Sequence, residues 1–312
     1  MNGIKFKKIV RSPLTGVILA LCLSCRLCAS GGNSGTTAAG FLKLDGSARA
    51  AAMGGAFAGV SGESSVVFYN PAGLANTDDT ALSFTHNFMF EDIFCDWISF
   101  MHNTKYGEFG AGVQYLSYGN IKRISETDVD SGTMSPYDMA LTLSHGRTIG
   151  DFSAGMNLKF VSSKIEDSAF AVCADFGGIY KMMNDDLSLG AVIQNLGTPM
   201  KFLDTSNPLP LNFRVGGQYN TDYNWTFAAD LNIPAYGMVN ACAGVEYNYD
   251  AGQNINILGR LGYATRTSLD GGLTGVTAGF GVKYNSYQFD YAFVPLGDLG
   301  LTHKIQIGMK ID

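Results

Sequence analysis

From residue 80 to residue 311 the sequence alternates almost without pause between apolar and polar side chains. In segment 276–285, Val, Ala, Phe, Val and Tyr occupy one face, and Thr, Gly, Gly, Lys and Asn occupy the other. A period of two places successive side chains on opposite faces of a β-strand. The pattern therefore predicts an all-β protein. A helical transmembrane protein is excluded, because no stretch after residue 30 holds about 18 consecutive apolar residues.

A soluble β-sandwich also alternates, since one face of each sheet meets water. Three features favour a transmembrane β-barrel instead. The apolar face is rich in large aromatic residues, as a lipid-facing surface requires. The polar face is rich in Gly and other small residues, which suits a crowded lumen, and Gly makes up 39 of the 312 residues. The segments are about ten residues long, enough to cross a bilayer at a tilt. Disorder is excluded, because the chain is 46% hydrophobic and only 15% charged.

The alternating segments number fourteen, so the prediction is an up-and-down antiparallel barrel of about 14 strands. They are expected at 80–88, 95–104, 108–119, 137–147, 151–163, 169–181, 187–195, 210–219, 225–233, 239–249, 255–264, 275–284, 287–294 and 301–311. Longer connections alternate with short ones rich in Asn, Asp, Gly and Ser, as in barrels with short periplasmic turns and longer outer loops. An even strand number leaves both termini at the periplasmic side.

The first 30 residues are predicted to be a cleaved signal peptide. A basic start precedes a short apolar run, Leu14–Leu23, and a small-residue stretch, Cys28–Gly31. An uncleaved anchor fits less well, because the run is short and Arg26 interrupts it. A lipoprotein signal lacks a convincing lipobox. The expected organisation is a signal peptide at 1–30, an N-terminal plug or hatch at 31–79, and an outer-membrane β-barrel at 80–312.

Charge and cysteine usage exclude further classes. The predicted signal holds five of the 21 basic residues and none of the 27 acidic ones, which leaves 16 basic against 27 acidic residues, a net of −11. Such a chain lacks the basic footprint that nucleic-acid binding needs. The remaining cysteines, Cys95, Cys173 and Cys242, match no zinc or redox spacing. At most one disulfide can form among them.

Four segments resemble the FadL-like group of outer-membrane barrels, and most closely the PorV/PorQ family. They are Gly46–Val60 (GSARAAAMGGAFAGV), Ser64–Ala75 (SSVVFYNPAGLA), Gln194–Gly197 (QNLG) and Pro295–Gly300 (PLGDLG). The matches run from about residue 40 to the C-terminal region. The resemblance implies a fourteen-stranded barrel with an N-terminal plug. The chain departs from the family in being short with modest loops, so large outer loops that hold a protein partner are in doubt.

The plug carries two candidate functional motifs. Asn70, Pro71, Ala72 and Gly73 form a compact turn, in which Pro71 fixes φ and the Asn70 side chain bonds the following backbone. This turn is either a gate against the barrel wall or a rigid lead-in to the first strand, and both roles can hold together. Residues Ala48–Gly55 are expected to form a short helix that packs closely. Met53, Gly54 and Gly55 are its predicted packing and termination residues.

The predicted lumen face carries charges of both signs. The basic candidates are Lys159, Arg214, Arg260, Lys283, Lys304 and Lys310, and the acidic ones are Asp138, Asp175, Asp230, Glu246 and Asp290. A mixed, nearly balanced set favours a paired, hydrogen-bonded interior. The alternative is a polar permeation path, but a selective pore more often shows a ring of one sign.

No enzymatic motif is found in the sequence. The four His residues have no metal-ligand partner at a suitable spacing, and the acidic loop 126–132 lacks the closing Glu of a calcium loop. Ser144 and His145 are adjacent in a predicted strand, so they point to opposite faces and form no dyad. The chain is expected to be no enzyme and to need no metal or cofactor.

The function is expected to be that of a non-enzymatic outer-membrane barrel of a diderm bacterium. The resemblance implies a role accessory to protein secretion or surface display of the type IX kind. The alternatives are a FadL-like channel for hydrophobic small molecules such as long-chain fatty acids, and a plugged structural barrel. Expected partners are outer-membrane lipid, with secretion-system proteins or a hydrophobic ligand. A lateral opening beside the plug would favour lipid transport, whereas a sealed wall and a lumen filled by ion pairs would favour a platform.

Overall fold

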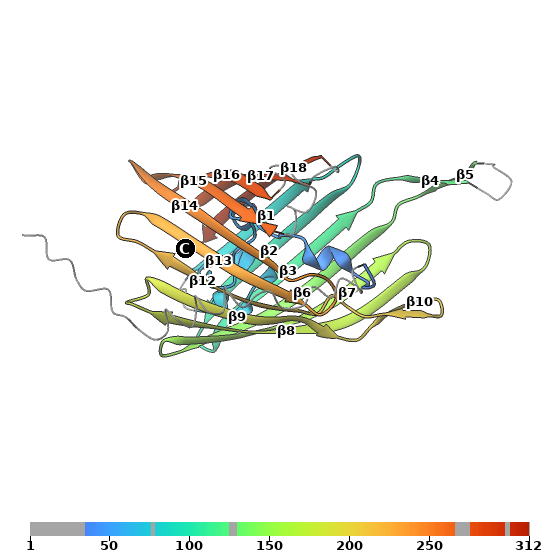
Figure 1. The fold of residues 1–312 in the computed structure, drawn as a ribbon, viewed down its shortest axis with the longest axis horizontal. Coiled ribbons are helices and arrows are strands. Elements are labelled where there is room, and N and C mark those ends of the chain that lie inside the picture. Colours follow the sequence, from blue (N-terminus) through green and yellow to red (C-terminus); the bar gives the residue numbers. More distant parts are fainter. Residues whose placement is uncertain (1–34, 76–78, 125–129, 266–274, 297–299, 312) are drawn as a thin grey trace, which may run out of the picture.

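The computed structural model describes residues 35–75, 79–124, 130–265, 275–296 and 300–311 (Figure 1). The predicted signal peptide lies outside these residues. Fourteen strands form one closed antiparallel barrel. They are β1 (Thr80–Phe88), β2 (Phe94–Thr104), β3 (Gly107–Ser117), β6 (Tyr137–Ile149), β7 (Phe152–Lys164), β8 (Ser168–Met182), β9 (Leu187–Gly197), β12 (Asn212–Asn220), β13 (Trp225–Pro234), β14 (Asn240–Gly252), β15 (Ile255–Ala264), β16 (Val276–Tyr284), β17 (Tyr287–Pro295) and β18 (Leu301–Ile311). The predicted fold class and strand number are confirmed.

Each strand pairs with its neighbours, and the barrel closes where β1 pairs with β18. The pairing of β2 with β3 and of β3 with β6 is continuous along the strands. The register shifts only between β8 and β9, near Asp175, and between β14 and β15, near Gly252, among the described barrel pairs. Because the barrel is closed, the backbone N–H and C=O groups at both edges of each strand have a partner strand, as is required in lipid. No helix among the described residues is long and apolar enough to span a membrane.

Strand boundaries differ from the predicted ones by a few residues. Strand β12 begins at Asn212 rather than 210, because Pro208 and Pro210 cannot donate a ladder hydrogen bond. Two additional hairpins stand in predicted loops: β4 (Ile121–Ile124) with β5 (Asp130–Met134), and β10 (Met200–Phe202) with β11 (Thr205–Asn207). The β4–β5 hairpin projects beyond one end of the barrel (Figure 1). The expectation of modest loops therefore understated this connection.

The two ends of the barrel differ. The end that carries the β4–β5 and β10–β11 hairpins is called the loop end, and the opposite end, with short turns such as Lys105–Tyr106 and Gly150–Asp151, is called the turn end. In outer-membrane barrels the short turns are periplasmic and the longer loops are extracellular. Strand β1 begins and β18 ends at the turn end, as the even strand number predicted.

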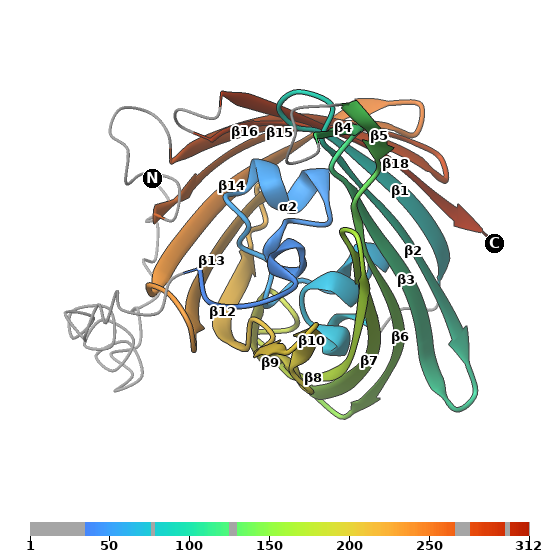
Figure 2. The same cartoon turned by 90° about the vertical axis from the view of Figure 1, so that its right-hand side faces the viewer.

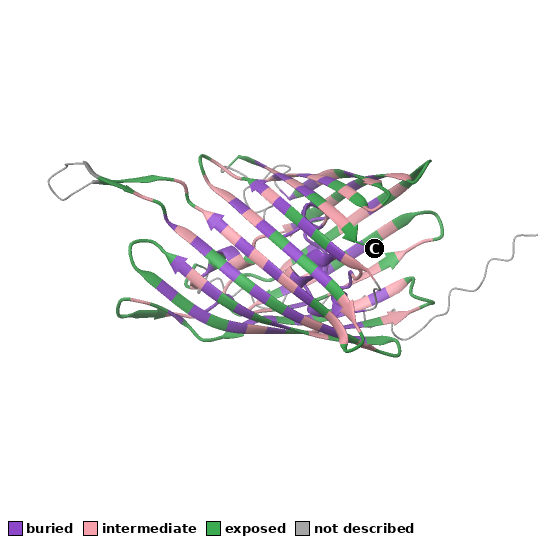
Figure 3. Cartoon of the chain, turned by 180° about the vertical axis from the view of Figure 1, so that it is seen from behind, coloured by how far each residue is buried: buried purple, intermediate pink, exposed green. Residues whose placement is uncertain are grey.

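The alternation of the sequence reappears as alternating burial along each strand (Figure 3). Leu158 is 38% exposed and Phe227 is 47% exposed, whereas Asn157 between Met156 and Leu158 is fully buried. The exposed rows are apolar and surround the outside of the barrel. This surface suits contact with lipid, and the buried rows face the lumen.

An arginine on the lipid-facing row is expected to lower the stability of the folded barrel. Leu158→Arg and Phe227→Arg place a charge in the apolar band, at a cost of about 2–4 kcal/mol at mid-bilayer. Leu158→Met and Phe227→Leu are the matched apolar controls. The measurement is the amount of heat-modifiable barrel in outer-membrane fractions. Equal amounts for the Arg and apolar variants would contradict the assignment of this face.

The interior of the barrel is occupied by the N-terminal segment 35–75, which is called the hatch below (Figure 2). It contains the 3-10 helix η2 (Gly40–Lys43), the α-helix α2 (Ala48–Ala52), and the 3-10 helices η3 (Ser64–Phe68) and η4 (Pro71–Leu74). Helix α2 contacts β15, β16, β17 and β18, whereas η4 contacts β6, β7 and β8. The hatch therefore touches opposite parts of the wall and spans the lumen.

Candidate functional site

The motif Asn70–Gly73 forms the first part of η4, near the turn end. The Asn70 side chain caps this helix: its Oδ1 accepts a hydrogen bond from the Ala72 N–H at 3.1 Å. The same amide donates from Nδ2 to the Ala58 carbonyl at 2.7 Å and to the Gly178 carbonyl of β8 at 3.3 Å. Asn70 therefore joins two parts of the hatch to the wall, and it is fully buried.

Helix α2 begins at a Ser47 cap and ends before two glycines. The Ser47 hydroxyl accepts from the Ala50 N–H. Gly54 and Gly55 have φ values of 71° and 88°, in the left-handed region that favours glycine. The structured helix is shorter than the predicted Ala48–Gly55, since Met53 already stands at its C-cap. Met53 is 1% exposed and packs with Ala56 against Ala228, Cys242 and Ala264 of the wall.

Wall glycines provide the space in which the hatch lies. A β-carbon at Gly155 would lie 2.3 Å from the Pro71 carbonyl carbon, and one at Gly177 would lie 2.0 Å from Asn70 Oδ1. At seven further wall glycines an added β-carbon would also lie within 3.1 Å of an atom of the hatch: Gly110, Gly112, Gly146, Gly190, Gly244, Gly262 and Gly279. So close an approach of the hatch to the wall backbone needs wall residues without side chains. The hatch is therefore fitted to this wall over eight strands.

One cluster of buried charges joins α2 to the wall. Arg49 donates to Glu246 Oε1 at 2.8 Å and to Glu63 Oε2 at 2.8 Å. Arg260 donates to Glu246 Oε2 and to Asp290 Oδ1, each at 2.6 Å. Burial would lower the pKa of Arg49, but Glu246 and Glu63 outweigh burial and raise it, so the guanidinium stays charged.

A second cluster lies at the register shift between β8 and β9. Lys159 Nζ lies 2.7 Å from Asp175 Oδ2 and 2.9 Å from Asn195 Oδ1. The Asn195 N–H donates to Asp175 Oδ1 at 2.8 Å, and φ of Asn195 is 62°. Asn157 Nδ2 bonds both Asp175 and the Val67 carbonyl of the hatch. The bulge thus places a polar network against η3.

Three further predicted lumen charges, Asp230, Arg214 and Lys304, contact the hatch. Asp230 Oδ2 accepts from the Phe57 and Ala58 N–H groups at 2.7 and 2.9 Å, and Arg214 lies 3.8 Å from the same carboxylate. Lys304 Nζ donates to the Asp45 carbonyl at 2.5 Å and lies 4.6 Å from the centre of the Trp97 ring. These three charges therefore hold the hatch and do not line an open path.

Three predicted lumen residues behave differently. Lys283 is partly buried on β16. Lys310 lies on the inward-facing row of β18 at the turn end, opposite the buried Ala81, but it pairs with Asp79 and its side chain is 54% exposed. The cause is its position next to the end of β18, beyond the closed interior. Asp138 is buried and bonds Ser163 and Tyr118.

Several residues of the site were not singled out by the sequence. Arg49 stood out only as the one charge in a run of alanines. Gln306, whose Oε1 accepts from Ser47 Oγ at 2.9 Å and the Ala48 N–H at 2.8 Å, looked like any lumen-facing polar residue. Gln194 of the QNLG motif donates to the Tyr69 carbonyl at 2.9 Å, which gives that motif a physical role.

Part of the lumen is apolar, which the alternation of the sequence did not indicate. Phe41 of η2 is 3% exposed and packs in a cluster with Cys95, Trp97 and Val161. The cluster also takes Met200 from β10. Cys95, Cys173 and Cys242 are buried and are not joined by disulfides. The loop-end half of the lumen is thus filled by a hydrophobic core that the hatch and the wall share.

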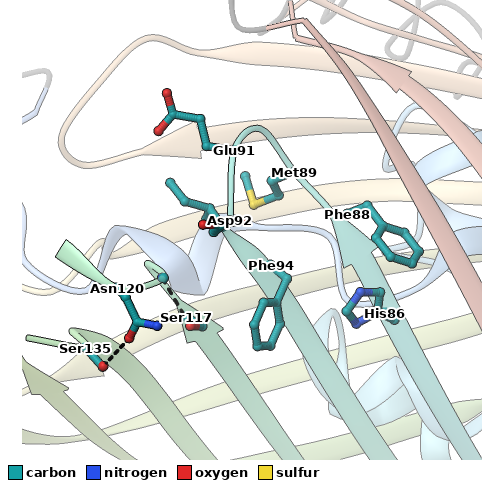
Figure 4. Close-up of a pocket in the computed structure, with 11 residues that line it drawn as sticks. His86, Phe88, Met89, Glu91, Asp92, Phe94, Ser117, Asn120 and Ser135 are labelled. Atoms are coloured by element: carbon teal, nitrogen blue, oxygen red, sulfur yellow. Dashed lines mark hydrogen bonds between the residues drawn. The ribbon is translucent and has the colours of Figure 1, made fainter. Parts of the chain in front are cut away.

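Two hollows lie on the outer face of the barrel. One, of about 570 Å³, lies at the loop end between the β1–β2 connection and the end of β3 (Figure 4). It is lined by His86, Phe88 and Phe94 on the outward row, and His86 pairs with Asp96 at 2.5 Å. The other, of about 470 Å³, is apolar and lies across β2, β3, β6 and β7. The apolar hollow opens on the lipid-facing side of the wall, whereas Met89 and Ile93, which line the loop-end hollow, also pack against the hydrophobic core of the lumen.

Solved structures of outer-membrane proteins share the fold of this barrel. The Pseudomonas putida toluene transporter TodX is 14% identical, with a TM-score of 0.53 over 86% of this chain and 97% of that one. A Pseudomonas aeruginosa FadL homologue is 12% identical, with a TM-score of 0.53 over 84% and 97% of the two chains. At these identities the likeness shows the fold alone. The protein is therefore an outer-membrane β-barrel with the FadL-like fold.

The family follows from the sequence itself. Residues 29–234, well over half of the chain, match the family described as "Type IX secretion system protein PorV". The chain belongs to this family, as its N-terminal motifs indicated. No curated protein sequence matches the chain. PorV and FadL-type barrels are non-enzymatic families.

Proposed function

We propose that this protein is a sealed, non-catalytic platform that serves protein secretion or surface display at the outer membrane. The observation that carries the proposal is the anchoring of the hatch. Wall glycines on eight strands touch it, and Glu246, Asp230 and Lys304 bond it directly. A lumen filled in this way suits a partner-binding barrel better than a channel. Family membership supports the same role.

The wall itself supports a platform. A FadL-like route for hydrophobic molecules would use a lateral opening between strands beside the hatch. The ladders from β1 to β3 and from β3 to β6 are continuous, and at the two register shifts, between β8 and β9 and between β14 and β15, the strands stay paired on both sides of the shift. The hydrocarbon-channel neighbours favour the alternative of hydrophobic uptake, but only through their fold. A purely structural, plugged barrel is the second alternative. Export by a cleaved signal at about residues 1–30 is part of the proposal.

The partner surface is proposed at the loop end. There the β4–β5 hairpin projects, with Ile121 41% exposed, and the hollow around His86 and Phe94 lies beside it (Figures 1 and 4). Projecting loops on a rigid barrel are where binding residues concentrate. Secretion-system proteins that reach the cell surface would meet this end.

An engineered disulfide between the hatch and the wall, which reductant can open, distinguishes a platform from a channel. A β-carbon at Gly110 would lie 2.9 Å from Val67 Cγ1, so Val67→Cys with Gly110→Cys falls within reach of disulfide spacing. The double variant is expected to restore protein secretion to a deletion strain equally well with and without reductant. The readouts are the secreted and surface proteome and uptake of a labelled long-chain fatty acid.

The single variants Val67→Cys and Gly110→Cys control for the substitutions alone. Secretion lost only in the oxidised double variant would contradict a fixed platform, because it would show that the hatch must move. Fatty-acid uptake that is abolished by the lock and restored by reductant would establish the channel alternative. Normal secretion in the deletion strain would leave only the structural role.

A further inference from the structure

We propose that the apolar hollow on the outer wall, together with a basic rim below it, binds one glycerophospholipid of the inner leaflet. The hollow is called the wall groove, and it is lined by Phe100, Phe109, Gly110, Ala111, Leu143, Ser144, His145, Met156 and Leu158. Its volume of about 470 Å³ lies in the range of small-molecule sites, about 300–1,000 Å³. This inference is independent of the secretion role.

The strand register explains why the groove exists. Ala111 pairs with Phe100 on one side and with Leu143 on the other, and Leu143 pairs with Leu158. The small Ala111 side chain therefore stands between larger neighbours on the same lipid-facing row. Phe100, Leu143 and Leu158 are 38–49% exposed and form the sides. A dent with an apolar floor and apolar sides takes a hydrocarbon chain.

The next rows toward the turn end become polar. One row down, Phe109 pairs with His145, whose rings lie 4.7 Å apart. One row further, the pairing of Glu108 with Gly146 places Arg147 beside Gly107, at the end of the β2–β3 turn. The sequence of rows is thus hydrocarbon, imidazole and guanidinium. A phospholipid presents acyl chain, glycerol ester and phosphate in the same order.

The rim carries two positive charges. Arg147 and Lys105 are exposed, and neither forms an ion pair within the described residues. Lys105 lies 5.0 Å from the centre of the Tyr106 ring, and Tyr106 is 67% exposed. By contrast Lys181 and Lys310, at other points of the same end, are paired with Asp185 and Asp79. In a chain with an acidic balance, these two cations complement a lipid phosphate.

The depth of the groove assigns the leaflet. Ala111 lies four residues beyond Gly107. At about 3.3 Å per residue and a tilt of about 40°, it stands roughly 10 Å above the turns. The apolar band of such barrels is about 25 Å tall. The groove therefore lies in the half of the bilayer next to the periplasmic turns, where glycerophospholipid and not lipid A is the phosphate-bearing lipid.

Lipid retention by the purified full-length barrel tests the site. After extraction in mild detergent and extended washing, bound lipid is identified and counted by mass spectrometry. Ala111→Leu fills the groove, and Arg147→Gln with Lys105→Gln removes the rim charge. Each neutralised charge is expected to lower retention about fivefold, which corresponds to the ~1 kcal/mol of one Lys or Arg near anionic lipid. The groove variant is expected to lose the bound phospholipid.

Matched controls keep the test specific. Ala229→Leu makes the same change elsewhere on the exposed outer face, and Lys122→Gln with Lys164→Gln removes two exposed charges toward the opposite end. Both are expected to retain lipid like the native protein, and heat-modifiability verifies folding of every variant. Equal retention in all variants would overturn the site, because it would show only general lipid contact. Retention of lipid A in place of glycerophospholipid would contradict the assignment of the groove to the inner leaflet.

Discussion

Replacing Arg260 with methionine is expected to lower the free energy of unfolding by about 3–5 kcal/mol, the usual result of breaking a buried ion pair. The Arg260 side chain is fully buried between Glu246 and Asp290, with both contacts at 2.6 Å. Its loss leaves Asp290 without its ion-pair partner and leaves Glu246 paired with Arg49 alone. Urea unfolding in detergent, followed by the fluorescence of Trp97 and Trp225, measures the change.

Two further variants serve as controls for Arg260→Met. Lys310→Met removes an exposed partner of Asp79, and exposed pairs contribute about 0–1 kcal/mol, so it is expected to be nearly neutral. Arg260→Met combined with Glu246→Gln and Asp290→Asn removes the three wall charges of the cluster and leaves Arg49 paired with Glu63, so it is expected to recover part of the loss. A single Arg260→Met variant no less stable than Lys310→Met would contradict the role given to this cluster.

The strands could be predicted from the sequence because two different solvents face each strand. In β7, Met156, Leu158 and Phe160 face lipid, whereas Asn157 and Lys159 face the lumen. The polarity of each residue therefore indicates the face of the strand on which its side chain lies. Fourteen such segments sufficed to define the barrel. The family resemblance added the hatch, whose own composition shows no strand period.

The pattern fails where both faces are apolar. In β8, Ala171 and Cys173 face the lumen while Phe170 and Val172 face outward. The lumen side is apolar here because it packs against Phe41 and other residues that the hatch contributes to a shared core. Alternation cannot report which apolar face meets protein, so this half of the site could not be predicted.

The charged lumen residues could be named but not their partners. Asp230 binds backbone N–H groups of Phe57 and Ala58, more than 170 positions away in the chain, and Glu246 binds Arg49. No local spacing encodes such pairs. The bulge at Asn195 was missed for a related reason: two consecutive residues, Gln194 and Asn195, are both buried, which breaks the period of two.

Replacing Gly155 with valine is expected to unseat the turn-end part of the hatch. A β-carbon there would lie 2.3–2.5 Å from the backbone of Pro71 and Ala72, and no rotamer change relieves a clash with backbone. Overpacking costs about 1–3 kcal/mol, which raises the unseated population about 5- to 150-fold. The barrel keeps its closed ladder and is expected to assemble. The measurement is entry of a large antibiotic that the intact outer membrane excludes.

The control is Gly259→Val, on the outward face of β15, where a β-carbon meets no atom within 4 Å. Gly73→Val offers a second route to the same state, since its β-carbon would lie 2.4 Å from the Val60 carbonyl oxygen within the hatch. Raised permeability at normal barrel abundance, in both hatch variants but not the control, would show that the Asn70–Gly73 turn closes the lumen. Normal permeability with reduced abundance would instead make the turn an assembly element, because the barrel would then depend on the hatch in order to close around it.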